Sequence, residues 1–264
     1  MGSGRRDGPR KMVTPSPLTI LILASPVPRQ APSGRLPLVG MSMYQHGVLR
    51  QQRVLLGLIL VMVAAFVWQM IVGSAGYSPF MCRPAEVTAS WRRLTDGGLN
   101  SSDIATFGTM LSCAILHADG GHILGNMFFL WLFAALAVEL LGSFWMLTIF
   151  FFAALTGSLG HTLLNPYDYT PTLGASGAVM GFEGAYLAMA VRWRLPDPHV
   201  FPLSRPVPPT NLAIMAVAYF ALDWSSVMNH SDSNVAFGAH LGGFMGGLFL
   251  TSFIARKPKM AELR

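Results

Sequence analysis

Long apolar blocks, separated by short polar connections, fill most of this 264-residue chain. A helix rises about 1.5 Å per residue, so about 20 apolar residues cross the roughly 30 Å of hydrocarbon in a bilayer. The six blocks run from about Val54 to Val72, His122 to Leu141, Phe144 to Leu164, Ala175 to Val191, Leu212 to Met228 and Val235 to Ala255. We therefore predict an all-α membrane protein, a bundle of six transmembrane helices with a long first loop on the outer side.

The composition supports a membrane protein and disfavours other classes. Only 11% of the residues are charged, against about 25% in soluble domains, which excludes a disordered protein and disfavours a soluble enzyme. The net charge of +6 does not require nucleic acid as a partner, because basic residues beside apolar spans set membrane orientation. Two cysteines are too few for a disulfide framework or a cysteine-based zinc site, and we predict no metal.

The chain divides into three parts by composition. Residues 1–45 contain seven prolines and five glycines, and we expect a disordered cytoplasmic tail. Alternatives for this segment are a signal peptide with Leu18–Ala24 as its apolar core, or a start assigned too early. Residues 46–256 form the six-span domain, and residues 257–264 form a short basic cytoplasmic tail.

Basic residues are distributed unevenly about the spans. If the N-terminus is cytoplasmic, the inner segments 1–53, 192–211 and 256–264 hold 15 of the 18 lysines and arginines. The outer loops hold the other three and six acidic residues. The positive-inside rule therefore predicts a cytoplasmic N-terminus. We expect a multi-pass protein of a bacterial inner membrane.

Four polar side chains lie at one predicted depth, in the outer third of three spans that run from outside to inside. His122 and Asn126 are four residues apart at the start of the second span, so they share a helix face. Ser176 begins the fourth span, and His240 lies five residues into the sixth. Polar side chains in a span are costly and indicate function, so together they predict one pocket. Taken singly, each also fits a structural role, such as a small-residue packing seam, an interfacial group or a cap.

Acyl transfer is the chemistry that these groups permit. A serine hydroxyl becomes a strong nucleophile when an imidazole takes its proton, which makes Ser176 the candidate nucleophile and His240 the candidate base. No acid is evidently placed to orient His240, because Asp223 lies in a different span, the fifth. The sequence therefore predicts a Ser–His dyad rather than a triad. The helix N-terminus at Ser176, with side-chain donors from His122 and Asn126, can stabilise the oxyanion.

Glycines predict a close contact between the fourth and sixth spans. Gly243 and Gly247 share a helix face with His240. The fourth span carries small residues at Gly177, Gly181 and Gly184. Small residues let membrane helices approach closely, so we expect the imidazole to come within reach of the serine hydroxyl.

Three segments resemble the signatures of the rhomboid intramembrane serine proteases. They read HADGGHILGNM (117–127), GASGAVMG (174–181) and AHLGGFMGG (239–247). Each falls on the expected span, and with six spans and a long first outer loop the resemblance covers roughly residues 50–256. It implies a rhomboid-like fold.

The resemblance also implies residue roles and partners. Ser176 would be the nucleophile and His240 the base, His122 and Asn126 would join the Ser176 N–H in the oxyanion hole, and His117 would support the first outer loop. Further supporting residues in the motifs are Gly174, Gly177, Gly243 and Gly247. Rhomboid proteases cut transmembrane segments of single-span proteins near the outer face of the bilayer, without metal or cofactor. The resemblance therefore implies such membrane proteins as substrates.

The sequence departs from the family pattern at two places. Gly108 and Thr109 stand where many members carry a Trp–Arg pair, so we expect the first loop to fold differently. Met180 stands where some members have a tyrosine that stacks on the histidine. That stacking is therefore absent or comes from another residue, such as Phe182.

Glu183 and the two cysteines lie outside this scheme. Glu183 is on the helix face of the serine but about 10 Å deeper. An intramembrane acid needs a partner, so we expect a structural hydrogen bond to a neighbouring span. Cys82 and Cys113 both fall on the outer side, where a disulfide is chemically allowed, and their pairing stays open.

Three function classes remain. A protease is favoured because both Ser176 and His240 are present. The second class is a catalytically inactive rhomboid-like adaptor that binds transmembrane segments. The third is a small-molecule transporter, for which an internal repeat would be expected, and the sequence shows none.

Overall fold

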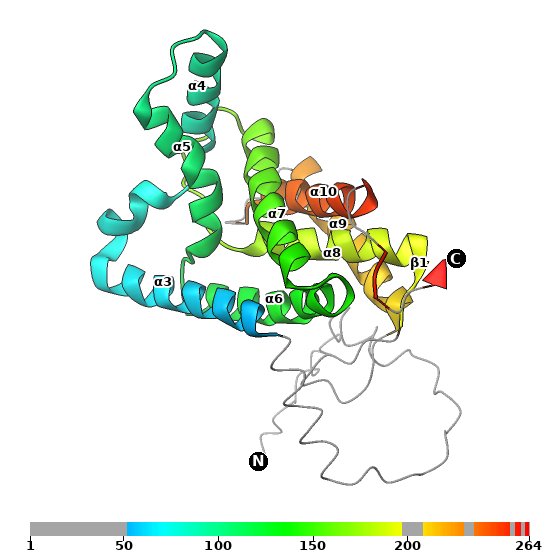
Figure 1. Cartoon of the computed structure of the whole chain (residues 1–264). Coiled ribbons are helices and arrows are strands. Elements are labelled where there is room, and N and C mark those ends of the chain that lie inside the picture. Colours follow the sequence, from blue (N-terminus) through cyan, green and yellow to red (C-terminus); the bar gives the residue numbers. More distant parts are fainter. Residues whose placement is uncertain (1–51, 197–207, 230–234, 254–256, 260–261, 264) are drawn as a thin grey trace, which may run out of the picture. The chain divides into compact units, whose positions relative to one another are not determined.

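A computed structural model describes residues 52–196, 208–229, 235–253, 257–259 and 262–263 of the chain. The predicted N-terminal tail therefore lies outside the described residues. The elements are α3 Arg53–Tyr77, η1 Ser78–Phe80, α4 Pro84–Thr95, α5 Ser101–Ser112, η2 Cys113–Ile115, α6 Gly120–Leu141, α7 Ser143–Leu164, α8 Ser176–Arg192, β1 Trp193–Arg194, α9 Pro209–Met228, α10 Phe237–Phe253 and β2 Glu262–Leu263 (Figure 1). The predicted all-α class is confirmed, apart from the two-residue strands β1 and β2, which pair antiparallel.

Four of the described helical segments are long and apolar enough to cross a membrane. They are Arg53–Phe80, Gly120–Leu141, Ser143–Leu164 and Pro209–Met228. The fourth and sixth predicted spans correspond to α8 and α10, which have 17 residues each and rise only about 25 Å. The chain is thus a multi-pass membrane protein, in which α8 and α10 are shorter than the four candidate spans.

The helix α8 forms the centre of the bundle. It packs against α6, α7, α9 and α10, and 13 of its 17 residues are buried. By contrast, α3 packs mainly against α6 and exposes large apolar side chains such as Met70 and Ile71, which are more than 70% exposed. Because hydrocarbon solvates such side chains, the exposed faces of the outer helices suit contact with lipid.

The first loop between spans is a folded unit rather than an open connection. Its helices α4 and α5 pack on each other and on α7, at one end of the bundle (Figure 1). Asn100 and Asp103 form a capping box at the start of α5, an arrangement that satisfies two backbone N–H groups of the first turn.

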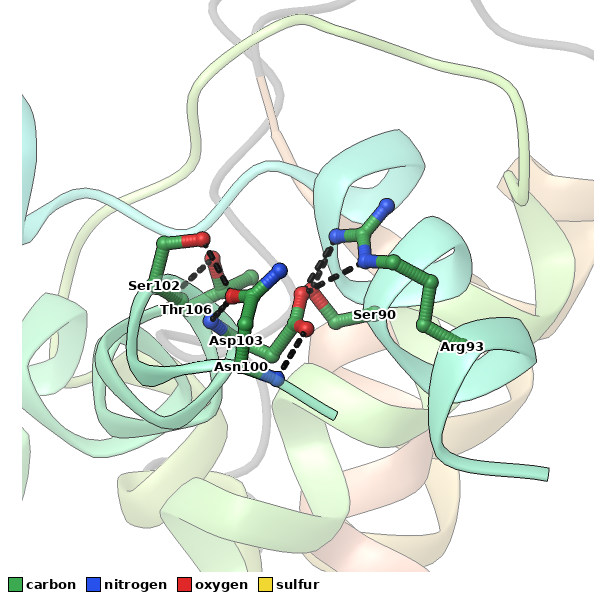
Figure 2. A network of polar contacts seen from close by, with 6 residues as sticks. All are labelled: Ser90, Arg93, Asn100, Ser102, Asp103 and Thr106. Carbon is green, nitrogen blue, oxygen red and sulfur yellow. Dashed lines mark hydrogen bonds and ion pairs between the residues drawn. The ribbon is translucent and has the colours of Figure 1, made fainter. Parts of the chain in front are cut away.

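A buried carboxylate joins α4 to α5 (Figure 2). The Asp103 side chain has no exposed surface, accepts a hydrogen bond from Ser90 Oγ at 2.7 Å, and forms an ion pair with Arg93. The Arg93 guanidinium holds the pKa of Asp103 well below its usual range. A buried charge is tolerated only when it is paired and hydrogen-bonded, so this network explains how a polar loop packs densely.

The same loop holds the segment that leads into α8. Cys82 pairs with Thr172 through two backbone hydrogen bonds of 3.1 and 2.8 Å, and the Gly174 N–H donates to the Cys113 carbonyl at 2.9 Å. Both cysteines are buried in one apolar cluster, and both are free thiols. The disulfide that the sequence left open is therefore not formed in this structure.

The opposite end of the bundle contains contacts between helix ends and the segments that follow them. The Lys259 N–H donates to the Leu140 carbonyl at the end of α6, at 2.8 Å. The Arg192 guanidinium lies 4.5 Å from the centre of the Trp193 ring and donates to the Ser252 carbonyl of α10. These contacts join the ends of α6, α8 and α10.

Candidate active site

The residues predicted to form the site lie at the beginnings of three helices that start at one end of the bundle (Figure 1). Ser176 is the first residue of α8, His122 lies in the first turn of α6, and His240 lies in the first turn of α10. The first backbone N–H groups of a helix have no partner within it, so the start of α8 offers donors beside the Ser176 side chain.

Gly174 brings α6 against the segment before Ser176. Its φ of 130° favours glycine, and a side-chain carbon added there would lie 2.8 Å from the His122 ring atoms Cε1 and Nε2. The same added carbon would lie 3.9 Å from Ser176 Oγ. His122 Nε2 therefore faces the backbone two residues before Ser176.

Glycines also bring α10 against α8. A side-chain carbon on Gly243 would overlap the carbonyl of Gly177, and one on Gly247 would overlap the carbonyl of Gly181. The close approach of these two helices, which the glycine pattern predicts, is confirmed.

The same approach brings the neighbours of the two catalytic candidates together. A carbon added to Gly177 would lie 3.0 Å from the carbonyl oxygen of Ala239, so the residues after Ser176 and before His240 are in contact. Between Ser176 and His240, both of them described, the structure contains no hydrogen bond. Such catalytic hydrogen bonds are often long before substrate binds.

The His240 ring is bonded to an acid that sequence reasoning set aside. Its Nδ1 lies 3.0 Å from Asp223 Oδ2, and the two side chains are 16% and 14% exposed. The structure thus places an acid beside His240, where none was evident from the sequence. An acidic residue inside an apolar span was the available signal, but it does not reveal which helix the acid faces.

An aromatic ring lies edge-on beside His240. It belongs to Phe237, whose ring centre is 6.3 Å away at an interplanar angle of 89°. Phe182, which the sequence suggested for this place, is instead buried in the main apolar core. The ring comes from one turn earlier on α10 itself.

Asn126 and His122 are linked along α6. Asn126 Nδ2 donates to the His122 carbonyl at 2.9 Å, and the Asn126 side chain is buried. An amide nitrogen carries two hydrogens, so a second donor remains for another acceptor. The His122 N–H donates to the Asp119 carboxylate at 2.8 Å, which caps the helix.

His117 has a buried ring that packs edge-on against His122, with ring centres 5.4 Å apart. Among the described residues, neither ring nitrogen has a hydrogen-bond partner. Burial, reinforced by the nearby His122, lowers the pKa of His117 to about 4. The ring is therefore neutral near pH 7.

The backbone of His117 is held by Gln69, a residue that the sequence analysis missed. The His117 N–H donates to Gln69 Oε1 at 3.0 Å, and Gln69 Nε2 donates to the His117 carbonyl at 3.1 Å. These two bonds connect the middle of α3 to the start of α6. A glutamine in an apolar span was the signal that could have found it.

A small cavity adjoins the serine. It has a volume of about 30 Å³ and is lined by residues that include Ser176, Gly174, Cys113 and Ser158. This volume fits one water molecule. Among the described ranges, no group of three or more His, Cys, Asp or Glu side chains is placed to hold a metal ion.

Glu183 is a buried acid in the middle of α8. The side chain is 2% exposed, and its Oε2 has no hydrogen-bond partner among the described residues. The structural hydrogen bond to a neighbouring span that the sequence predicts is therefore absent at this oxygen.

The sequence also matches a known protein family. The rhomboid domain matches residues 105–257, which is more than half of the chain. This chain belongs to the rhomboid family. The match includes the segments that carry Ser176, His240, His122 and Asn126.

Two proteins of Bacillus subtilis (strain 168) are similar to this rhomboid protein. YdcA, whose name assigns it to the rhomboid proteases, is 28% identical over 182 residues, covering 68% of this chain and 83% of YdcA. The rhomboid protease GluP is 25% identical over 169 residues, covering 59% of this chain and 30% of GluP. Both relatives are bacterial.

Proposed function

We propose that this rhomboid protein is an intramembrane serine endopeptidase. It would hydrolyse peptide bonds in or near the outer ends of transmembrane segments of single-span membrane proteins. The observation that carries the proposal is the convergence of three helix starts, with His122 against Gly174 and Ala239 against Gly177. Membership of a family of intramembrane serine proteases supports the same conclusion.

The proposed reaction begins at Ser176. His240 Nε2 takes the hydroxyl proton while Oγ attacks the substrate carbonyl carbon. The negative charge on the carbonyl oxygen is stabilised by the Ser176 N–H, the free N–H of Asn126 Nδ2 and the His122 Nε2–H. The carbon–nitrogen bond then breaks, and His240 gives its proton to the leaving amine. Water repeats the sequence and releases the acid product.

The membrane arrangement follows from the same proposal. With α8 and α10 counted as the short fourth and sixth members, the helices form a six-span bundle. The basic side chains of the inner segments orient the N-terminus to the cytoplasm. The site then opens to the outer side, where water can reach the cavity beside Ser176. A substrate helix must unwind there, because its peptide groups are otherwise hydrogen-bonded within the helix.

The experiment that tests the proposal uses the full chain in lipid vesicles with a model single-span substrate. We expect cleavage that falls at least about 10³-fold in the variant Ser176→Ala. A fluorophosphonate probe should label the wild type and not this variant. Ser226→Ala is a matched control, because Ser226 lies on α9 and its hydroxyl donates to the Leu222 carbonyl of the same helix.

The inactive adaptor is the other outcome. A wild type that is folded, captures the substrate and neither cleaves it nor reacts with the probe would reject the protease. Cleavage that survives Ser176→Ala would reject the assignment of the nucleophile.

A further inference from the structure

Asp223 places a carboxylate against Nδ1 of the His240 imidazole. Asp223 Oδ2 lies 3.0 Å from His240 Nδ1, and both side chains are more than four-fifths buried. If the Asp223 carboxylate carries its negative charge, it can only accept, and Nδ1 then carries the hydrogen in this pair. The other ring nitrogen, Nε2, is then unprotonated in the neutral imidazole.

The packing of α9 explains why Asp223 points at the site. Leu212 and Ala216 are buried, and Asp223 follows on the same helix face, seven residues after Ala216. Ala216 packs with Met180 of α8 and Phe244 of α10. The opposite face is at least half exposed at Ile214, Val217, Leu222 and Trp224. The acid thus faces the protein interior, together with Leu212 and Ala216, while these four exposed side chains face outward.

A purely structural role accounts poorly for an acid at this place. An acid in a membrane span is expensive and needs a partner. The Phe220 ring, one turn earlier on α9, already packs on Phe244 of α10 with ring centres 4.8 Å apart, so apolar contacts hold the two helices together. Asp223 adds a directional bond to the one side chain of α10 whose tautomer the proposed reaction requires.

We propose that Asp223 is the positioning residue for His240 and completes a Ser176–His240–Asp223 triad; this inference rests on the proposed protease function. By accepting the Nδ1–H, Asp223 holds the ring in the tautomer and orientation in which Nε2 can accept the Ser176 proton. When Nε2 takes that proton, the imidazolium keeps its Nδ1–H bond to the carboxylate. The proton passes from Nε2 to the leaving amine, and Asp223 stays ionised throughout.

The test compares Asp223→Asn with wild type, using the full chain in vesicles and the single-span substrate. An asparagine amide can donate to Nδ1 and hold the wrong tautomer, so we expect kcat to fall about 10²–10⁴-fold. We expect KM to change by less than about threefold, because Asp223 does not touch substrate. The rate of fluorophosphonate labelling at Ser176 should fall with kcat. Asp223→Glu, which keeps the carboxylate, should recover part of the activity.

A matched control removes an acid that does not touch His240. Asp168 lies in an outer loop and its carboxylate accepts from the Thr170 N–H, so Asp168→Asn should keep kcat near wild type. A double variant gives a second readout, because the losses of activity caused by residues that act as one catalytic unit do not add. In a His240→Ala background, Asp223→Asn should cause no further loss of labelling, whereas a structural role would add its own loss.

The outcomes separate this inference from the proposed function. Ser176-dependent cleavage with unchanged kcat in folded Asp223→Asn would overturn the triad and leave the protease intact. Absence of any Ser176-dependent cleavage in wild type would reject the protease itself. If Asp223→Asn does not fold, Asp223→Ser replaces it, because membrane helices tolerate serine. The same fall in kcat is expected, and activity near wild type in that variant overturns the inference.

Discussion

His117 supports the site through its backbone and packs its ring without polar partners. The main-chain N–H and carbonyl are both bound by Gln69, while the ring contacts His122 edge-on. This arrangement suits a neutral ring, because a charged imidazolium without hydrogen bonds is costly to bury.

We expect the stability of the protein to fall between pH 6.5 and about 4 because of His117. The unfolded chain binds a proton with a pKa near 6.5, while burial lowers the pKa of the folded His117 to about 4. In that window the unfolded state holds more protons, so acid favours unfolding. The loss reaches about 3 kcal/mol at the acid end.

Unfolding midpoints of wild type and His117→Gln, measured from pH 7.5 to pH 4.5, check this expectation. The variant should lose most of the slope in this window. Equal slopes in the two proteins would show that another group controls the acid sensitivity. A variant that is less stable at pH 7.5 still tests the prediction, because only the dependence on pH is compared.

Among whole elements, α8 and α10 are positioned by contact between their backbones. Gly177 and Gly181 of α8 present their carbonyl groups to Gly243 and Gly247 of α10 with no room for a side chain between them. Close packing of this kind replaces the hydrophobic effect as the source of helix association in lipid. The same contact determines how near Ser176 comes to His240.

We expect Gly243→Ala to separate α8 from α10. The added carbon would overlap the Gly177 carbonyl, and overpacking of this kind costs about 1–3 kcal/mol. Labelling of Ser176 by a fluorophosphonate probe should slow at the same time, since the base moves away from the hydroxyl. Denaturation in a single detergent measures the free energy of unfolding, and probe kinetics measure the rate of Ser176 labelling.

Gly57→Ala is the matched control for this change. Gly57 lies in α3, and a carbon added there meets nothing within 4 Å. Alanine is the better helix former by about 0.5–1 kcal/mol, so this variant should be as stable as wild type or slightly more so. Equal behaviour of the Gly57 and Gly243 variants would contradict the role of close approach.

Across the whole molecule, the two ends of the bundle differ in chemistry. The end at which α6, α8 and α10 begin carries the folded loop of α4 and α5, which the Arg93–Asp103 pair joins. The other end carries Arg192 and the segment that contains Lys259. The positive-inside rule assigns the second end to the cytoplasm.

Single cysteines on the two ends test this orientation. In a background without Cys82 and Cys113, Asp96→Cys should react with a membrane-impermeant maleimide in intact cells. Lys257→Cys should react only after the membrane is permeabilised. Both positions are exposed, so unequal reactivity reports the side of the membrane. The reverse pattern would invert the proposed orientation and place the site on the cytoplasmic side.

What the sequence alone determined is local. Block lengths predicted the helices, and the spacing in HADGGHILGNM, GASGAVMG and AHLGGFMGG predicted which residues begin α6, α8 and α10. Small residues at Gly177 and Gly243 predicted that α8 and α10 approach closely. These features repeat every turn or depend on residue size, so they can be recognised without knowing the fold.

Only the tertiary structure decided the longer-range pairs. Asp223 reaches His240 because α9 is rotated to place its Leu212–Ala216 face against α8 and α10. Gln69 reaches His117 across 48 residues of chain, and the ring that lies edge-on to His240 belongs to Phe237 rather than to Phe182. The rotation and height of each helix result from the summed packing of many side chains. Helical periodicity places an acid on one face of its own helix but leaves open which neighbour that face meets.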